Sequence, residues 1–134
     1  MRAQLWQIVE AENLAEARDI VTSTSWAVFL AQLADNTPLG FVEAHLRDYA
    51  EGAGSSPVGY LEGWYVRADH RRKGIGAALV GAAEQWAQTR GCVEMGSDTQ
   101  LGNAVSAAAH ARLGYGETER LICFLKRLDS APQQ

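Results

Sequence analysis

The clearest chemical signal in the sequence is a turn rich in arginine and glycine, placed between a predicted strand and a long predicted helix. This Arg/Gly turn consists of Arg71, Arg72, Lys73, Gly74, Ile75 and Gly76. Free N–H groups at a helix start point outward, glycines let a diphosphate approach the backbone, and the three cations add complementary charge. The spacing fits neither the GxxxxGKS/T loop of nucleotide hydrolases nor the full GxGxxG pattern, so neither ATP nor NAD is expected. A basic turn with a glycine hinge is the alternative.

Two carboxylates are candidates for the chemistry. Glu62 lies in Leu-Glu-Gly-Trp on a predicted central strand, just before the Arg/Gly turn. A carboxylate in apolar surroundings needs a partner or a raised pKa, so Glu62 is either a general base or a solvated or salt-bridged strand residue. Asp98 follows the next predicted strand at its carboxyl end, where ligands collect in open α/β sheets. The alternative role of Asp98 is a turn or helix cap, for which Asn103 competes.

The first half of the chain predicts a helix and a hairpin. Asn13 followed by Glu16 has the form of a capping box, which favours a helix over roughly 13–23. Two apolar runs, 26–34 and 39–47, are separated by the turn residues Asp-Asn-Thr-Pro and indicate an antiparallel hairpin. A surface loop over 48–57 follows.

The second half predicts two strand-helix units that position the chemical residues. Aromatic and β-branched residues favour a strand over 58–66, and apolar residues at three- and four-residue steps predict a helix over 74–90 that ends at Gly91. A short strand over 93–97 and a helix over 104–113 come next, and this order favours parallel pairing of the two strands. We expect residues 117–128 to add an antiparallel strand.

Length and composition set the broad class. A chain of 134 residues with 47% apolar residues predicts a single α/β domain over 1–134, with residues 129–134 frayed. The formal charge of −4 argues against nucleic acid and suits a cationic substrate. Cys92 and Cys123 have no metal-ligand spacing and are expected to be buried, reduced thiols, so no metal is predicted. No apolar stretch predicts a membrane span or signal peptide, which leaves a cytoplasmic location as the default.

The chain resembles the GCN5-related N-acetyltransferase superfamily. Arg71, Gly74 and Gly76 match its acetyl-CoA signature Q/R-x-x-G-x-G/A in the expected strand-to-helix position. The segments 55–66, 91–106 and 110–127 look like one branch, the aminoglycoside 6′-N-acetyltransferases, so the similarity spans about residues 38–128. The resemblance implies transfer of an acetyl group from acetyl-CoA to the 6′-amine of an aminoglycoside by direct attack, which confers antibiotic resistance.

The resemblance also implies a fold and a coenzyme site. The expected fold is a mixed, mostly antiparallel sheet flanked by helices, with a V-shaped splay between two parallel strands. The pantetheine arm would enter the splay and be held by backbone groups near Tyr65 and Val66, while Asn103 would contact pantetheine. Many relatives carry a tyrosine that protonates the coenzyme thiolate where this chain has His110. His110 could donate that proton or be a packing residue of an alanine-rich helix.

The substrate residues are implied in the same way. Glu62 would act as base, often through water in related enzymes, and Asp98 and Glu119 would bind amines of the aminoglycoside. Trp6 and Tyr49 match aromatic positions that line the aminoglycoside cleft. The structural alternative for Glu119 is an exposed strand charge. The other tryptophans are more simply assigned to the core; they are Trp26, Trp64 and Trp86.

One departure from the family is larger than a side chain. The family fold normally opens with a strand and a helix before the point equivalent to Trp6, and this chain is expected to lack that strand. The sheet edge would be bare or filled otherwise, and an exposed edge invites pairing with a second chain. A homodimer, usual in this branch, is therefore expected.

Two other function classes stay open at this point. The first keeps the acetyltransferase but changes the acceptor to a polyamine, a metabolite amine or a protein amine, because substrate choice lies in the loop 48–57. The second is an acyl-CoA-binding module without turnover. Nucleic-acid binding has only one short basic cluster on an acidic chain to support it, so no nucleic-acid or membrane partner is expected.

Overall fold

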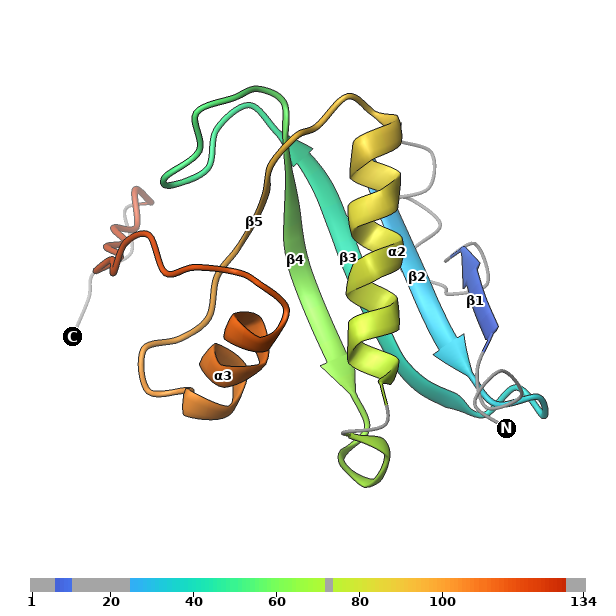
Figure 1. Ribbon diagram of the computed structural model, residues 1–134. Coiled ribbons are helices and arrows are strands. Elements are labelled where there is room, and N and C mark those ends of the chain that lie inside the picture. Colours follow the sequence, from blue (N-terminus) through green and yellow to red (C-terminus); the bar gives the residue numbers. More distant parts are fainter. Residues whose placement is uncertain (1–6, 11–24, 72–73, 130–134) are drawn as a thin grey trace.

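The computed structural model describes residues 7–10, 25–71 and 74–129 (Figure 1). Its strands are β1 (Gln7–Glu10), β2 (Trp26–Gln32), β3 (Pro38–Arg47), β4 (Val58–Val66) and β5 (Met95–Ser97). Its helices are α2 (Ile75–Thr89), α3 (Ala104–Arg112) and the short 3-10 helix η4 (Ala68–His70). The predicted succession of strand, helix, strand and helix after residue 58 is confirmed.

The strands form one mixed sheet in the order β1-β2-β3-β4-β5. All neighbouring pairs are antiparallel except β4 and β5, which are parallel. The predicted hairpin is closed between β2 and β3 by Asn36, whose φ is 72°, and by Asp35, which accepts a 3.0 Å hydrogen bond from the Thr37 amide. The mixed, mostly antiparallel sheet expected from the sequence is therefore present.

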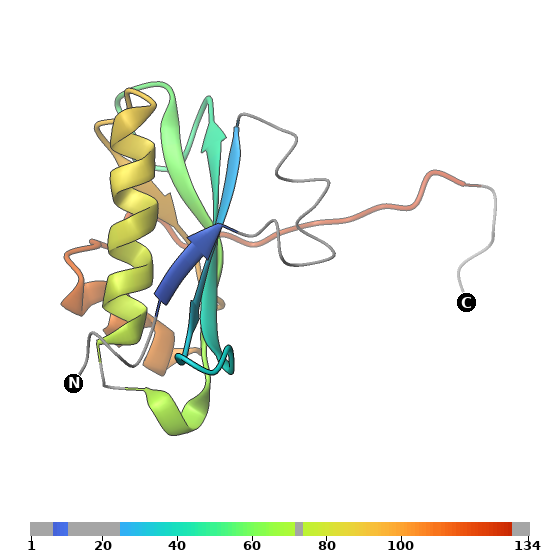
Figure 2. The same cartoon turned by 90° about the vertical axis from the view of Figure 1, so that its right-hand side faces the viewer.

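Helix α2 covers one face of the sheet and builds most of the core (Figure 2). Its buried side chains Ile75, Leu79 and Ala83 pack against a group from β3 and β4 that includes Val42 and Leu61. Full burial of a side chain such as Leu79 contributes about 2–3 kcal/mol to folding. The helix starts after Gly74, whose φ of 82° suits glycine, and this places the helix start beside the end of β4.

The predicted splay lies between β4 and β5. The two strands pair only at Gly59–Met95, Tyr60–Gly96 and Leu61–Ser97. β4 continues to Val66 without a partner on that side, so the strands separate beyond Leu61 and Ser97 (Figure 1). We call this opening the fork.

The carboxyl-terminal part of the described chain differs from the prediction. Residues 117–128 form no strand, and their side chains are exposed. No described strand of the same chain lies beside β5 to pair with them, because β5 is the last strand of the sheet. The expectation of two buried thiols is half wrong for the same reason: Cys92 is buried, whereas Cys123 lies in this unpaired segment and is exposed.

The amino-terminal edge of the sheet is filled by β1, which pairs antiparallel with β2. The sheet edge that we expected to be bare or filled otherwise is thus taken by Gln7–Glu10. The predicted helix over 13–23, Trp6 itself and residues 130–134 of the predicted frayed end lie outside the described residues. Within the described ranges, no helix has the length and apolar character needed to cross a membrane.

Candidate functional site

Glu62 lies at a bulge in the centre of the sheet. In the register between β3 and β4, Glu43 faces Gly63 and the next residue, Ala44, faces Leu61. Glu62 is therefore the extra residue of β4, which has no residue opposite it in the register with β3. Bulges locally re-aim side chains and are common next to active sites.

The Glu62 carboxylate is held by a cation from the neighbouring strand. Arg47 donates from Nε to Oε2 and from Nη2 to Oε1, each over 2.9 Å. His45 Nδ1 lies 3.5 Å from Oε2, and the Glu62 side chain remains 22% exposed. Glu62 is thus a salt-bridged strand residue in this structure, which was the alternative to its role as general base, and its side chain is still partly exposed to solvent.

Asp98 is held by a buried tyrosine. The Tyr60 hydroxyl donates a 2.6 Å hydrogen bond to Asp98 Oδ2, and Tyr60 is 3% exposed. Burial raises the pKa of Tyr60, and the hydrogen bond to the Asp98 carboxylate raises it further, so the phenol stays protonated and keeps donating. Asp98 follows the end of β5, as predicted, and its partner Tyr60 is a strand residue of β4.

Arg47 connects the two carboxylates. Its guanidinium carbon lies 3.5 Å from the centre of the Tyr60 ring while its nitrogens bind Glu62. The set Glu62, Arg47, Tyr60 and Asp98 therefore forms one linked arrangement, which we call the Arg47 network. Two negative groups and one fixed positive group at a sheet surface would suit a ligand that carries ammonium groups.

An aromatic pair borders the Arg47 network. The rings of Trp26 and His45 are stacked, with centroids 4.0 Å apart and an angle of 18° between planes. Trp26 was assigned to the core with Trp64 and Trp86, and only those two pack against the main core cluster. Trp26 instead lies beside the residue that contacts Glu62.

His110 lies at the fork and has both ring nitrogens engaged. Nδ1 is 2.8 Å from the Ser106 carbonyl oxygen, which can only accept, so Nδ1 carries a hydrogen. In the neutral ring Nε2 then accepts from the Ser97 hydroxyl at 2.7 Å. The ring also meets Trp64 edge-on at 5.3 Å. His110 thus combines packing with a polar link to Ser97, the last residue of β5.

The Arg/Gly turn leads from the fork into α2. Arg71 Nε donates to the Val66 carbonyl over 3.0 Å, and its guanidinium carbon is 5.9 Å from the centre of the Tyr65 ring. Arg72 and Lys73 lie outside the described residues. The Ile75 side chain is buried in the core, so only its backbone can face a ligand.

Two glycines keep the start of α2 open. At Gly74 a Cβ would meet no atom of the described residues within 4 Å, which leaves room on that side for a ligand at the helix start. At Gly76 a Cβ would lie 3.2 Å from Cζ2 of Trp64, so the absent side chain allows β4 and α2 to approach. A fork between strands that leads to an open helix start fits the pantetheine arm and diphosphate of the expected coenzyme.

The remaining predicted residues are spread around this centre. Asn103 accepts a 3.0 Å hydrogen bond from the Ser106 amide and is the N-cap of α3, which matches its structural alternative. Tyr49 is 62% exposed, and Glu119 is exposed in the unpaired segment. Among the described residues no hydrogen bond or ion pair joins Tyr49 or Glu119 to the Arg47 network. Their predicted contacts with a substrate stay predictions.

The sequence analysis missed Arg47, Tyr60 and His45. Tyr60 could have been found, because it lies two residues before Glu62 and would share its face of a regular strand. Arg47 and His45 could not, because their approach to Glu62 depends on the bulged register between β3 and β4.

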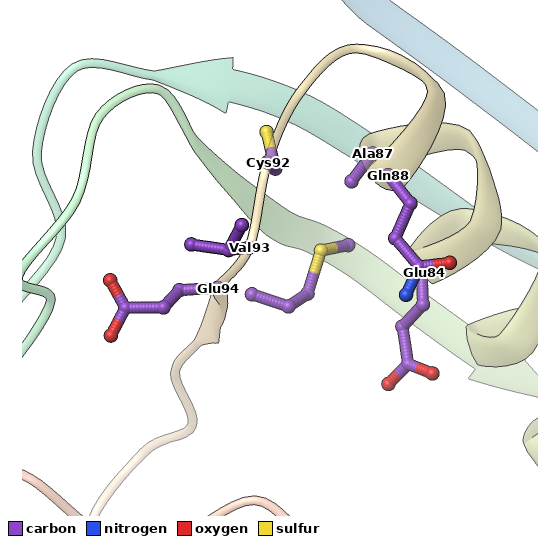
Figure 3. Close-up of a pocket in the computed structure, with 7 residues that line it drawn as sticks. Glu84, Ala87, Gln88, Cys92, Val93 and Glu94 are labelled. Atoms are coloured by element: carbon purple, nitrogen blue, oxygen red, sulfur yellow. The ribbon is translucent and has the colours of Figure 1, made fainter.

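A hollow lies at the opposite end of β5 from Asp98 (Figure 3). It measures about 160 Å³ and lies between the last turns of α2 and the chain that enters β5. Its lining residues include Glu84 and Ala87 from α2, and Val93 and Glu94 before β5. No group of three or more metal-ligating side chains within the described ranges is placed to hold a metal ion.

Comparison with known proteins identifies relatives along almost the whole chain. Residues 4–115 match the model of the acetyltransferase (GNAT) family. The chain is 44% identical over 132 residues to aminoglycoside N(6′)-acetyltransferase type 1 of Klebsiella aerogenes, covering 96% of this chain and 87% of that protein. The protein of the same name from Stenotrophomonas maltophilia is 40% identical, with coverages of 96% and 84%.

Solved structures of similar proteins have the same fold. The structure of AAC(6′)-Iy in complex with a bisubstrate analogue, CoA-S-monomethyl-acetylneamine, matches with a TM-score of 0.79 and 39% identity, over 95% of this chain and 87% of that one. The 6′-N-acetyltransferase AAC(6′)-IG of Acinetobacter haemolyticus, without ligand, matches with a TM-score of 0.78 and 38% identity, over 96% and 88%.

Proposed function

Because the chain belongs to the acetyltransferase (GNAT) family, we propose that it transfers the acetyl group of acetyl-CoA to the 6′-amine of aminoglycosides and thereby confers antibiotic resistance. The observation that carries this proposal is the 44% identity to an aminoglycoside N(6′)-acetyltransferase along 87% of that protein's length. The pair of carboxylates in the Arg47 network supports it independently, because aminoglycosides are polycations.

Acetyl-CoA binds along the fork and the Arg/Gly turn. Backbone groups of Tyr65 and Val66 hold the pantetheine arm, and Asn103 contacts it from the start of α3. The diphosphate lies at the start of α2 against the backbone of Gly74, Ile75 and Gly76, where the helix dipole favours negative charge. Arg71, Arg72 and Lys73 add positive charge. The Val66 carbonyl that Arg71 now binds marks the junction of the two parts of the site.

The aminoglycoside binds next to the Arg47 network. Glu62 and Asp98 accept hydrogen bonds from its ammonium groups, Glu119 binds a further amine, and Trp6 and Tyr49 supply flat apolar surfaces for the sugar rings. The loop 48–57, which carries Tyr49, lies next to the start of β4 and determines which acceptors fit.

The reaction is a direct attack of the neutral 6′-amine on the thioester carbonyl. Glu62 takes a proton from the 6′-ammonium, and the nitrogen–carbon bond forms. The nitrogen then loses its second proton to solvent, and the carbon–sulfur bond breaks to leave the amide and the coenzyme thiolate. His110, in its protonated form, supplies the proton that the thiolate takes up. Ser97, 2.7 Å from His110 Nε2, orients the ring toward the fork.

A second candidate keeps the chemistry and changes the acceptor to a polyamine, a metabolite amine or a protein amine. The exposed Tyr49 favours this possibility, because a partly open acceptor site accommodates amines of different shape. Thiol release from acetyl-CoA should be measured with kanamycin, spermidine and a lysine-containing peptide as acceptors. Turnover with kanamycin at least tenfold faster than with the other two supports the aminoglycoside, whereas the reverse order supports the second candidate.

The acceptor and the assembly complete the proposal. The protein acts on the aminoglycoside in the cytoplasm as a homodimer, and no nucleic acid takes part. Purified protein that bound acetyl-CoA but released no thiol with any amine would contradict an enzymatic role and favour a coenzyme-binding module.

A further inference from the structure

A serine and a histidine meet at the point where the fork opens. Ser97 is the last residue of β5 and the last one that pairs with β4, opposite Leu61. Its hydroxyl donates to Nε2 of His110 over 2.7 Å, and His110 comes from α3, which lies beside the open part of the fork (Figure 1). Both side chains are half-buried, so a ligand in the fork can still reach the pair.

The Ser106 carbonyl fixes the tautomer of the neutral His110 ring. The ring hydrogen lies on Nδ1, 2.8 Å from that oxygen, and Nε2 keeps its lone pair for the Ser97 hydroxyl. A hydroxyl, an imidazole and a fixed acceptor in this order are the parts of an activated serine nucleophile: the imidazole takes the hydroxyl proton, and the third group orients the imidazole. Ser97 is therefore placed to act as a nucleophile.

The strand opposite Ser97 supplies donors for the charge that such an attack creates. Beyond Leu61, β4 continues to Val66 with no described strand on its fork side. A strand side without a neighbour presents unpaired N–H groups, so part of the backbone of 62–66 offers hydrogen-bond donors to the fork. Backbone N–H groups of this kind stabilise the negative oxygen of a tetrahedral intermediate. The fork thus has a nucleophile on one side and donors on the other.

The thioester of acetyl-CoA is the reagent that fits this arrangement. In the proposed function the pantetheine arm enters the fork, and His110 delivers a proton to the coenzyme sulfur. The carbonyl carbon bonded to that sulfur then lies close to the Ser97 hydroxyl, which is hydrogen-bonded to the same ring. The inference rests on the proposed coenzyme site and does not depend on which amine is acetylated.

We propose that the protein has a second, slower activity: it hydrolyses acetyl-CoA through an acetyl ester on Ser97 when no acceptor amine is bound. Ser97 Oγ bonds to the thioester carbonyl carbon while His110 Nε2 takes the hydroxyl proton. The carbon–sulfur bond then breaks, and the same proton passes from Nε2 to the coenzyme thiolate. Water next gives a proton to Nε2 as its oxygen bonds to the ester carbon. The bond from that carbon to Oγ breaks, Ser97 takes the proton back, and acetic acid leaves.

The two proposed reactions use opposite forms of His110. Acetyl transfer to an amine uses the protonated ring, which donates to the thiolate, whereas attack by Ser97 uses the neutral ring, which accepts from the hydroxyl. A neutral amine is a stronger nucleophile than a hydroxyl. An aminoglycoside held beside Glu62 therefore takes the acetyl group first and suppresses the ester.

The first test measures thiol release from acetyl-CoA by the whole protein without an acceptor. Wild type should release thiol continuously. Ser97→Ala should lower this rate by about 100-fold or more, because the nucleophile is lost, but should lower transfer to kanamycin by less than about tenfold, because there Ser97 only orients His110. Thr89→Ala removes a hydroxyl at the end of α2 and should leave both rates unchanged. Calorimetric titration shows whether each variant binds acetyl-CoA.

The second test looks for the ester in the wild-type protein and so does not depend on the folding of a variant. The protein is mixed with acetyl-CoA labelled in its acetyl group, quenched in acid and digested with trypsin. Mass spectrometry should find the label on Ser97, in the peptide 91–112 that ends at Arg112. Kanamycin added before the coenzyme should lower the labelled fraction.

Three results would overturn the inference. Thiol release that Ser97→Ala leaves unchanged would mean that water attacks the thioester directly. Label on a lysine and none on Ser97 would mean that the acetyl group reaches the protein by another route. Turnover with kanamycin but neither thiol release nor ester in its absence would leave the proposed function standing alone. Hydrolysis that depends on Ser97, without transfer to any amine, would instead support the inference and contradict the proposed function.

Discussion

Arg47 binds both carboxylate oxygens of Glu62 through two hydrogen bonds of 2.9 Å. The proposed base of the reaction is therefore already paired with a cation of its own chain. A substrate ammonium must share or displace that guanidinium to reach Glu62. Arg47 also lies on the Tyr60 ring, and the Tyr60 hydroxyl donates a hydrogen bond to Asp98. A movement of Arg47 would therefore also change the contacts that position the Asp98 carboxylate.

Glu62→Gln should lower kcat by about 100-fold or more, because an amide cannot take the proton from the 6′-ammonium. Acetyl-CoA binding should be unchanged, since the fork and the Arg/Gly turn are untouched. Steady-state kinetics and calorimetric titration of acetyl-CoA check the two parts. Asp35→Asn, in the distant turn between β2 and β3, serves as control and should keep wild-type kcat.

Arg47→Lys should reduce kcat/KM by about tenfold, because lysine keeps the charge but cannot make the two parallel hydrogen bonds to Glu62. Arg47→Met should also lower the free energy of unfolding by about 1 kcal/mol, since it leaves a partly exposed carboxylate without its partner. Kinetics and urea denaturation of both variants test this. Equal kcat/KM in wild type and Arg47→Lys would mean that the paired geometry has no part in catalysis.

The free energy of unfolding should fall as the pH rises above about 10. Burial raises the pKa of Tyr60 and of Tyr115, and hydrogen bonds to Asp98 and Glu84 add to it. Their unfolded pKa is 10.0, so above that pH the unfolded chain loses protons that the folded chain keeps. Each phenol contributes a slope of up to about 1.4 kcal/mol per pH unit.

Urea denaturation between pH 8 and pH 11 measures that slope. Tyr60→Phe and Tyr115→Phe should each reduce the slope by the contribution of one titrating phenol. Below pH 9, loss of the hydroxyl should lower the free energy of unfolding by about 1–2 kcal/mol. A pH-independent free energy of unfolding in wild type would contradict the assignment of the buried Tyr60 and the partly buried Tyr115 as hydrogen-bond donors.

Gly76→Ala should weaken acetyl-CoA binding, because the added methyl lies 3.2 Å from Trp64 and narrows the junction between β4 and α2. Gly81→Ala in the same helix is the matched control. A Cβ there meets no atom of the described part of the chain within 4 Å. The change should therefore leave binding unchanged and raise stability by about 0.5–1 kcal/mol through helix propensity. Coenzyme titration and thermal denaturation of the two variants separate the effects.

The fork and its flanking elements could be predicted because local patterns determine them. The apolar spacing over α2, the glycines that bound it and the short strand before Asp98 all give local signals. They correctly place Glu62 on β4 and Asp98 directly after the neighbouring strand β5. Asn103 shows the limit of such signals, since the same residue type at a helix start serves as cap or as ligand contact.

The rest depended on pairings between distant segments. A shift of one residue at the β3–β4 bulge decides that Arg47 meets Glu62, and no single-segment pattern contains that register. The apolar run over 121–125 predicted a strand, and this prediction is wrong, because a strand needs a partner. Within the described chain there is none beside β5, so the predicted strand is not formed and Cys123 is exposed.

The most direct test of the proposed function is thiol release from acetyl-CoA with aminoglycosides that differ at one position. Kanamycin and tobramycin carry a 6′-amine, whereas paromomycin carries a 6′-hydroxyl. We predict turnover with the first two and at least 100-fold less with paromomycin, because paromomycin lacks the nitrogen that attacks the thioester. Equal turnover with all three would show that another amine is acetylated and would contradict 6′-specific transfer.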